Sequence, residues 1–257
     1  MVEGPFWPRH LAGAQLRRAF ADTAVMLARV IRAFRTGALD LLYPPGCAAC
    51  DGPISTGAFC EPCSASLVEL LDACPRCALP RDGSCVGCVG GALDAVFAAY
   101  AFGGALADAL RFLKFAARID LGEPLGALLV PQLHALLPRL TTPLIVPVPL
   151  PTSRLKTRGY NQAALLALGA AEPLGLAVRA DLLHRTRDTE AQVGRPAGSR
   201  RLALAGAFAA ASAVDGRDVV LVDDVMTTGA TLTACALALR VAGARRVVAL
   251  TVGRALP

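Results

Sequence analysis

The sequence has few aromatic residues, few charged residues and no long uninterrupted apolar run. Aromatic side chains make up 5% and charged side chains 18% of the 257 residues. The longest apolar region, 128–150, contains His134, Arg139 and several prolines, which makes it a poor membrane-spanning helix. The N-terminal segment has no continuous apolar core followed by a small-residue cleavage site, so we expect no signal peptide. We therefore expect a cytoplasmic protein.

The remaining composition describes a folded chain. Hydrophobic residues make up 54% of it, which excludes the low-hydrophobicity type of disorder for most of its length. The net charge of +6 suits phosphorylated or nucleic-acid partners, but such a charge is also common in arginine-rich proteomes. The chain has only His10, His134 and His184 as histidines, and none stands in a nucleophile–base pattern. Catalysis centred on histidine is not expected.

Cysteine is abundant for a chain without an export signal, which favours metal binding or free thiols over disulfides. Two C-x2-C pairs complete the tetrahedron that zinc prefers, and a four-thiolate site has no open position for a substrate. We therefore predict two structural zinc sites; sequential pairing of the C-x2-C pairs is the simplest arrangement, and interleaved pairing stays open. Cys235 lies apart, in a predicted helix, and is expected in the core. The predicted sets are Cys47, Cys50, Cys60 and Cys63, then Cys74, Cys77, Cys85 and Cys88.

Apolar strands alternate with helices after the cysteine segment. This alternation predicts a parallel α/β sheet with helices on both faces. The expected strands are 93–102, 144–148, 219–223 and 247–252, and the expected helices are 104–119, 121–137, 161–171 and 231–241.

The chain is expected to contain three regions. Residues 1–40 form an amphipathic helical extension, 41–90 a double zinc ribbon, and 91–257 the α/β domain. The apolar positions of 11–35 recur at helical spacing. We favour packing of this helix on its own protein, with a membrane-surface or partner helix as the alternative.

The segment VVLVDDVMTTGATL, 219–232, carries the most specific chemistry. A parallel strand delivers its carboxyl end to the crevice where ligands bind, so Asp223 and Asp224 are expected beside a pocket. The following loop precedes a helix, where backbone N–H groups favour an anion. The acids would hold hydroxyls or a metal, and a ribose 5-phosphate meets both demands. The expected phosphate-binding residues are Thr227, Thr228, Gly229, Ala230 and Thr231.

This segment resembles the phosphoribosyl pyrophosphate (PRPP) motif of type I phosphoribosyltransferases. Together with LYPPGCAAC, LKF at 113–115 and VPVPLPTSRLKTRGYNQAALLA at 146–167, it is similar to the ComF family of competence-associated, phosphoribosyltransferase-like proteins. The resemblance implies a type I phosphoribosyltransferase-like fold with an N-terminal double zinc ribbon. It also implies PRPP with Mg²⁺ as ligand, with the acids on the ribose 2- and 3-hydroxyls. Ala203 stands where the family has asparagine.

Pyrophosphate needs cations near the acids. Arg154, Lys156 and Arg158 follow a strand whose end should face the same crevice, and they are our candidates; the alternative is a solvated charge run. The family resemblance implies Lys114 as a further candidate for contact with the pyrophosphate. One hypothesis is an enzyme that transfers a phosphoribosyl group to an unknown acceptor. The other is a non-catalytic accessory protein that senses nucleotides or handles single-stranded DNA. Candidate partners also include DNA-uptake proteins and a second copy of the chain.

Overall fold

The computed structural model describes residues 45–80, 88, 91–187, 204 and 206–257. The predicted helix over 11–35, the 1–40 extension, Cys85 and Ala203 lie outside these residues. Cys47–Gly52 and Thr56–Pro257 form one compact unit, and the description below concerns that unit. Among the described residues, no helix combines the length and the apolar character needed to cross a bilayer.

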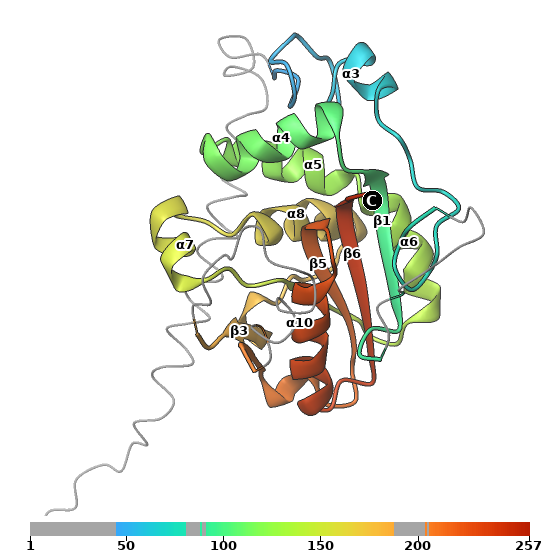
Figure 1. Ribbon diagram of the computed structural model, residues 1–257, viewed down its shortest axis with the longest axis vertical. Coiled ribbons are helices and arrows are strands. Elements are labelled where there is room, and N and C mark those ends of the chain that lie inside the picture. Colours follow the sequence, from blue (N-terminus) through green and yellow to red (C-terminus); the bar gives the residue numbers. More distant parts are fainter. Residues whose placement is uncertain (1–44, 81–87, 89–90, 188–203, 205) are drawn as a thin grey trace, which may run out of the picture. The chain divides into compact units, whose positions relative to one another are not determined.

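A four-stranded parallel sheet forms the centre of the unit (Figure 1). Three of its strands are rich in valine, leucine and isoleucine and the first in the chain is rich in alanine; most of these side chains are buried because helices cover the sheet. The predicted parallel sheet flanked by helices is confirmed. In spatial order, the strands are β1 (Ala95–Ala101), β6 (Arg246–Arg254), β5 (Asp218–Met226) and β2 (Leu144–Pro147).

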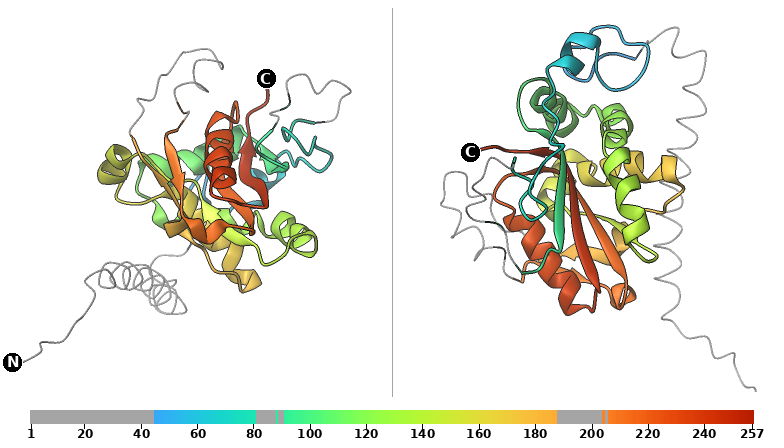
Figure 2. Two further views of the ribbon diagram at one scale, coloured as in Figure 1. Left: turned by 90° about the horizontal axis from the view of Figure 1, so that it is seen from below. Right: turned by 90° about the vertical axis from the view of Figure 1, so that its right-hand side faces the viewer.

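Helices cover both faces of this sheet (Figure 2). Helix α10 (Ala230–Val241) packs on one face and α8 (Gln162–Ala171) on the other, where α5 (Gly122–Ala127) packs on α8. Helix α4 (Gly104–Phe115) follows β1, α6 (Val130–Leu136) follows α5, and α7 (Thr152–Arg158) follows β2. The helix predicted over 121–137 is thus two short helices. Pro131, in the first turn of α6, explains the break because proline cannot donate within a helix.

Shorter elements complete the unit. Strands β3 (Leu183–Arg185) and β4 (Phe208–Ala210) pair antiparallel, and β4 lies against α10. In the cysteine segment, α3 (Glu61–Ala65) begins after Cys60 with Pro62 in its first turn. The 3₁₀ turns are Ile119–Leu121, Leu137–Arg139, Glu172–Leu174, Ala180–Leu182 and Ser212–Val214.

Helices α5 and α8 approach closely at two glycines. A Cβ on Gly126 would lie 2.3 Å from the Leu166 carbonyl oxygen, and one on Gly169 would lie 2.4 Å from that of Glu123. Backbone atoms cannot move aside as a flexible side chain can. The two glycines therefore set the distance between the helices.

We expect Gly126→Ala to lower the free energy of unfolding by about 1–3 kcal/mol, the usual cost of overpacking a filled interior. Denaturant unfolding measures this change. Gly103→Ala is the matched control, because a Cβ there meets nothing within 4 Å. Equal stability of the Gly126→Ala variant and the wild type would show that the close approach is not rigid.

Candidate functional site

The two acids lie inside β5 and not at its end. We predicted that the strand would end at Asp223, but it continues to Met226 because β6 pairs with it as far as Arg254. The opposite neighbour is shorter, since the pairing of β2 with β5 ends at Pro147 and Val222. Asp223 and Asp224 follow directly, where β5 has passed the end of β2. The acids therefore lie beside the carboxyl end of β2, the edge at which parallel sheets bind ligands.

The side chains of the two acids belong to opposite faces of the sheet, because successive strand residues alternate. Asp224 meets Lys114 of α4 and Gln162 of α8 on one face. Asp223 lies toward Cys235 of α10, on the other face. Burial is the largest cause that raises the pKa of the Cys235 thiol, and the charge of Asp223 raises it further. The two carboxylates nevertheless interact, because the charge of Asp224 and a hydrogen bond with its side chain are among the causes that raise the pKa of Asp223, after the larger effect of burial.

Asp224 is 6% exposed and held by several donors. Its Oδ2 forms an ion pair with the Lys114 ammonium and accepts from Gln162 Nε2 at 3.4 Å. Its Oδ1 accepts from the Val225 backbone N–H at 2.6 Å. Lys114, which sequence resemblance suggested for pyrophosphate, thus neutralises an acid of the site in this structure.

Asp223 has a different electrostatic setting. Burial raises its pKa well above the usual value, and the neighbouring charge of Asp224 raises it further. The Asp224 backbone N–H donates to Asp223 Oδ1 at 2.9 Å and opposes these effects, as does the charge of Lys114. The ionised form of Asp223 therefore costs free energy until a ligand supplies further donors.

The predicted phosphate loop connects β5 to α10. Thr227, Thr228 and Gly229 span the gap, and Gly229 has φ of 75°, a left-handed conformation that favours glycine. Ala230 and Thr231 begin α10, whose first turn has N–H groups without carbonyl partners inside the helix. The Ala230 N–H lies 3.4 Å from Thr228 Oγ1. A helix of this length that starts at the end of a central strand favours an anion at the loop.

The basic candidates on α7 differ in position. Arg158 donates to Gln162, which in turn contacts Asp224, so Arg158 belongs to the same network. Its guanidinium lies 5.4 Å from the centre of the Phe115 ring, and burial lowers its pKa. Arg154 is exposed but close enough to Arg158 to lower that pKa further. Lys156 is exposed on α7.

The sequence analysis assigned no individual role to three residues that the structure places in or beside the site. Gln162 is a buried amide at the first position of α8 and connects Arg158 to Asp224. The Tyr160 hydroxyl donates to the Leu113 carbonyl and so fixes the end of α4 beside α8. Arg254 is a buried cation at the end of β6. A buried polar residue among alanines marks Gln162, but only the three-dimensional contacts identify the other two.

The described cysteines gather in two sequential groups. The sulfurs of Cys47, Cys50, Cys60 and Cys63 lie within 4.8 Å of one another, and so do those of Cys74, Cys77 and Cys88. Sulfurs bound to zinc at about 2.3 Å in a tetrahedron are about 3.8 Å apart. The Cys50–Cys60 and Cys74–Cys88 sulfur distances are both 3.7 Å, and Cys77–Cys88 is 3.9 Å. The residues fit zinc, and the groups follow the sequential pairing.

Within the first group, the surroundings of Cys47 favour a thiolate, whereas a hydrogen bond with the Cys60 side chain and further causes raise the pKa of Cys63 to about 12. Burial acts to raise the pKa of Cys47, but backbone N–H groups near its sulfur outweigh burial and lower the pKa to about 6. Zinc binds thiolates, so less proton release is needed at this position. Cys235 is fully buried in α10, as predicted for a core residue.

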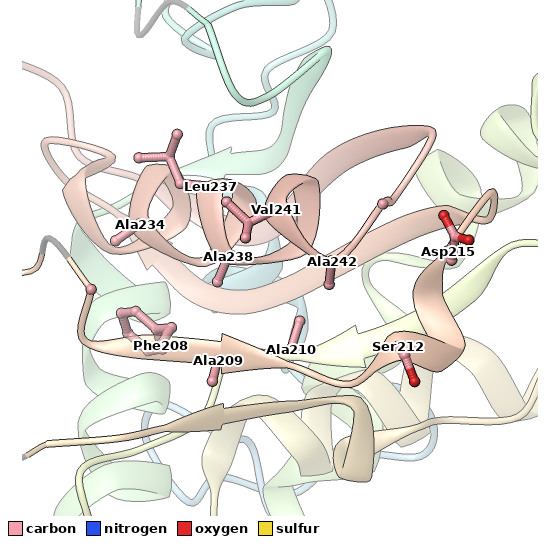
Figure 3. Close-up of a pocket in the computed structure, with 12 residues that line it drawn as sticks. Phe208, Ala209, Ala210, Ser212, Asp215, Ala234, Leu237, Ala238, Val241 and Ala242 are labelled. Atoms are coloured by element: carbon pink, nitrogen blue, oxygen red, sulfur yellow. The ribbon is translucent and has the colours of Figure 1, made fainter.

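A groove on another part of the unit lies between α10 and β4 (Figure 3). Its volume is about 750 Å³, and apolar side chains such as Phe208, Leu237 and Val241 line it. The acidic side chain among its lining residues, Asp215, would repel a phosphate. The groove is therefore not a second candidate for an anion.

The chain matches two known domain families. Residues 38–90 match the double zinc ribbon domain, and residues 158–254 match the phosphoribosyl transferase domain. The second match contains the acids, the loop and Arg158, whereas Lys114, Arg154 and Lys156 precede it. The fold and the families therefore agree.

Proteins named for DNA use and competence are similar to this chain. DNA utilization protein YhgH of Escherichia coli K12 is 34% identical over 75% of this chain and 89% of its own length. Competence protein F of Haemophilus influenzae is 39% identical over 40% of this chain and 46% of its own. The crystal structure of TT1426 from Thermus thermophilus covers 51% of this chain and 72% of its own at 24% identity, with a TM-score of 0.30, which is too low to inform on fold.

Proposed function

This chain belongs to the ComF family, and we propose that it binds PRPP with Mg²⁺ and transfers the phosphoribosyl group to an acceptor. The observation that carries the proposal is the position of Asp223 and Asp224, in the last part of β5, just before the loop 227–231 that follows the strand. Loop N–H groups would receive the 5-phosphate, and the carboxylates would accept from the ribose hydroxyls. These are the groups that a phosphorylated ribose presents.

The proposed reaction breaks the bond between the anomeric carbon and pyrophosphate, and forms one between that carbon and the acceptor. Positive charge develops on the ribose, and ionised carboxylates nearby would stabilise it. Pyrophosphate leaves with the bond electrons, and Mg²⁺ would offset its charge beside the acids. Arg158 and Arg154 are proposed to face the pyrophosphate. Lys114 would join them if the ligand displaced it from Asp224.

Calorimetry tests this proposal with three ligands. PRPP with Mg²⁺ is expected to bind, and ribose 5-phosphate is expected to compete more weakly because it lacks the pyrophosphate contacts. ATP is expected to compete poorly, because its phosphates are not attached to a ribose with a free anomeric position. No PRPP binding would overturn the proposal, and pyrophosphate release with an acceptor would establish turnover.

A change in the loop provides a separate prediction. Thr228→Val keeps the size of the side chain but removes the hydroxyl near the Ala230 N–H, so we expect affinity for ribose 5-phosphate to fall about fivefold to tenfold, the effect of one lost hydrogen bond. Thr228→Ser retains the hydroxyl and is expected to bind like the wild type. If both variants bound equally, the hydroxyl would have no role in phosphate binding.

A second proposed function is single-stranded DNA handling without turnover, which the names of the similar proteins favour. DNA-uptake proteins and a second copy of the chain are proposed partners for that role. The exposed cations on α7, Arg154 and Lys156, would contact phosphates, and few aromatic residues are available for stacking.

Such DNA binding is expected to depend mainly on charge. With one phosphate each for Arg154 and Lys156, affinity for an oligothymidine should fall about sevenfold between about 50 and 200 mM salt, because bound cations are released from the DNA. Fluorescence anisotropy measures this dependence. Tight binding that barely changes with salt, or preference for one sequence, would contradict an electrostatic mode.

A further inference from the structure

Arg254 lies between the second cysteine group and the proposed phosphate loop. It is the last residue of β6 and only 8% exposed. Its Nε donates to the Cys77 carbonyl at 2.7 Å. Its Nη1 donates to the carbonyls of Met226, Thr227 and Ala255 at 3.0, 2.6 and 2.6 Å. One buried side chain thus contacts two segments about 150 residues apart in sequence, a separation read from their positions along the chain.

These contacts fix the orientation of the loop. In a planar trans peptide, the C=O of one residue points opposite to the N–H of the next. With the Met226 and Thr227 carbonyls directed at Arg254, the N–H groups of Thr227 and Thr228 point away from it. An anion cradled by the loop needs those N–H groups directed outward. The Ala255 N–H also donates to the Met226 carbonyl at 2.9 Å, so the sheet shares in holding the first of these peptide planes. Arg254 therefore holds the Thr227–Thr228 peptide plane in the orientation that phosphate binding requires and reinforces the plane before it.

At its other end, Arg254 contacts a turn that zinc would fix. The Cys77 and Ala78 N–H groups both donate to the Cys74 carbonyl, at 3.3 and 2.8 Å, which folds the chain between the two thiols. The Arg76 N–H lies 3.4 Å from Cys74 Sγ. Zinc bound by Cys74 and Cys77 would hold this turn, because a closed thiolate site constrains its ligands. The Cys77 carbonyl would then be held toward Arg254.

We propose that Arg254 couples the second zinc site to the phosphate loop, so that zinc at this site orders the loop for an anionic ligand. Arg254 is a positioning residue, since it acts through the loop backbone. The effect on the loop is independent of the ligand; only the effect on ribose 5-phosphate rests on the function proposed above.

Hydrogen exchange measured by mass spectrometry on the full zinc-loaded chain tests the coupling without a ligand. The N–H groups that report on the loop are those of Thr233 and Ala255, which donate to the Gly229 and Met226 carbonyls at 2.9 Å. Cys88→Ser, which weakens the second site, is expected to speed exchange of these two N–H groups at least tenfold, while 247–252 of the core strand stays protected. Cys63→Ser, at the first site, is the matched control and should leave both unchanged. Arg254→Lys keeps a cation but cannot reproduce the four contacts, and should speed exchange of the same two N–H groups at intact zinc content.

The double variant separates coupling from general destabilisation. In an Arg254→Lys background, Cys88→Ser should add less than twofold to the exchange rate of the Thr233 and Ala255 N–H groups, because the connection is already broken. An undiminished effect in that background, or unchanged exchange in both single variants, would overturn the proposal. Loss of protection in 247–252 would mean that a variant had unfolded. If this happens to the Cys88→Ser variant, the coupling is judged from Arg254→Lys alone, whose exchange must be faster than that of the wild type.

A binding measurement adds a reciprocal test. If zinc at the second site strengthens ribose 5-phosphate binding by some factor, ribose 5-phosphate must strengthen zinc binding by the same factor. We expect about fivefold, seen as a lower zinc dissociation constant in equilibrium competition with a chromophoric chelator, and lost in Arg254→Lys. If ribose 5-phosphate does not bind at all, the proposed function fails and the exchange result decides the coupling. Binding without an effect on zinc affinity would contradict the coupling alone.

Discussion

Replacing Asp223 and Asp224 together by asparagine is expected to lower the affinity for ribose 5-phosphate about a hundredfold or more. Hydrogen bonds to charged groups contribute about 1.5–3 kcal/mol each, and about 1.4 kcal/mol corresponds to a factor of ten. Asparagine keeps the size of the side chain, so the loop geometry is retained. Calorimetry with ribose 5-phosphate and with PRPP–Mg²⁺ measures the loss. Equal affinity of the double variant and the wild type would remove the acids from the site.

The two single variants should affect stability in opposite directions. Burial and the charge of Asp224 raise the pKa of Asp223 well above 3.8, so its ionised form disfavours the folded state. Asp223→Asn removes that cost and should raise the melting temperature at neutral pH while it weakens ligand binding. Asp224→Asn breaks the ion pair with Lys114 and should lower the melting temperature.

The raised pKa of Asp223 determines how this carboxyl changes the stability of the folded state as pH rises. A carboxyl whose pKa is raised on folding binds its proton more tightly in the folded state. Its contribution to stability is therefore greatest at low pH and is lost as pH rises from about 3.8 through the raised pKa. The stability advantage of Asp223→Asn over the wild type should grow across that range. An advantage that shrinks with rising pH would contradict the raised pKa.

Local patterns predicted much of the fold. The helix expected at 161–171 is present because Asn161 caps it, accepting from the Ala163 N–H at 3.0 Å. The helix expected at 231–241 begins one residue earlier, after Gly229. The extension of β5 through Asp224 to Met226 could not be read locally, because it depends on pairing with β6, which is distant in sequence. The residue at which β5 ends therefore depends on its neighbour in the sheet and cannot be predicted from the sequence of β5 alone.

The candidate site could be predicted only as far as local sequence order allows. The order of acids, threonines and glycine predicts a ligand site near the carboxyl end of β5, because that order is continuous in sequence, and this stays a prediction. The pairing of Asp224 with Lys114 depends on how α4 packs beside α8, and periodicity does not specify it. Arg254 lies outside every motif, since its partners at Cys77 and Met226 converge only in the folded chain.

Removing zinc is expected to have the largest effect on the cysteine segment. Purified protein made with ample zinc should contain two zinc ions per chain, because the Cys47, Cys50, Cys60 and Cys63 sulfurs form one group and Cys74, Cys77 and Cys88 belong to another. Structural zinc contributes about 10–16 kcal/mol of binding free energy in small zinc modules, and much of it is folding free energy. Over 45–80 and at 88, the part of the segment that the structure describes, the short helix α3 is the main regular element, so few other contacts there can replace that contribution.

Cys60→Ser should therefore unfold the first zinc region and reduce the zinc content from two ions to one. Cys235→Ser is the matched control, because that thiol is buried in α10 away from both groups and should leave the zinc content unchanged. Elemental analysis measures the content, and limited proteolysis measures unfolding of 47–66 against the protected sheet. The sulfurs of Cys50 and Cys60 are 3.7 Å apart, the spacing of two ligands on one zinc, so a Cys60→Ser variant that kept both ions and its protection would show that the four sulfurs do not share a metal.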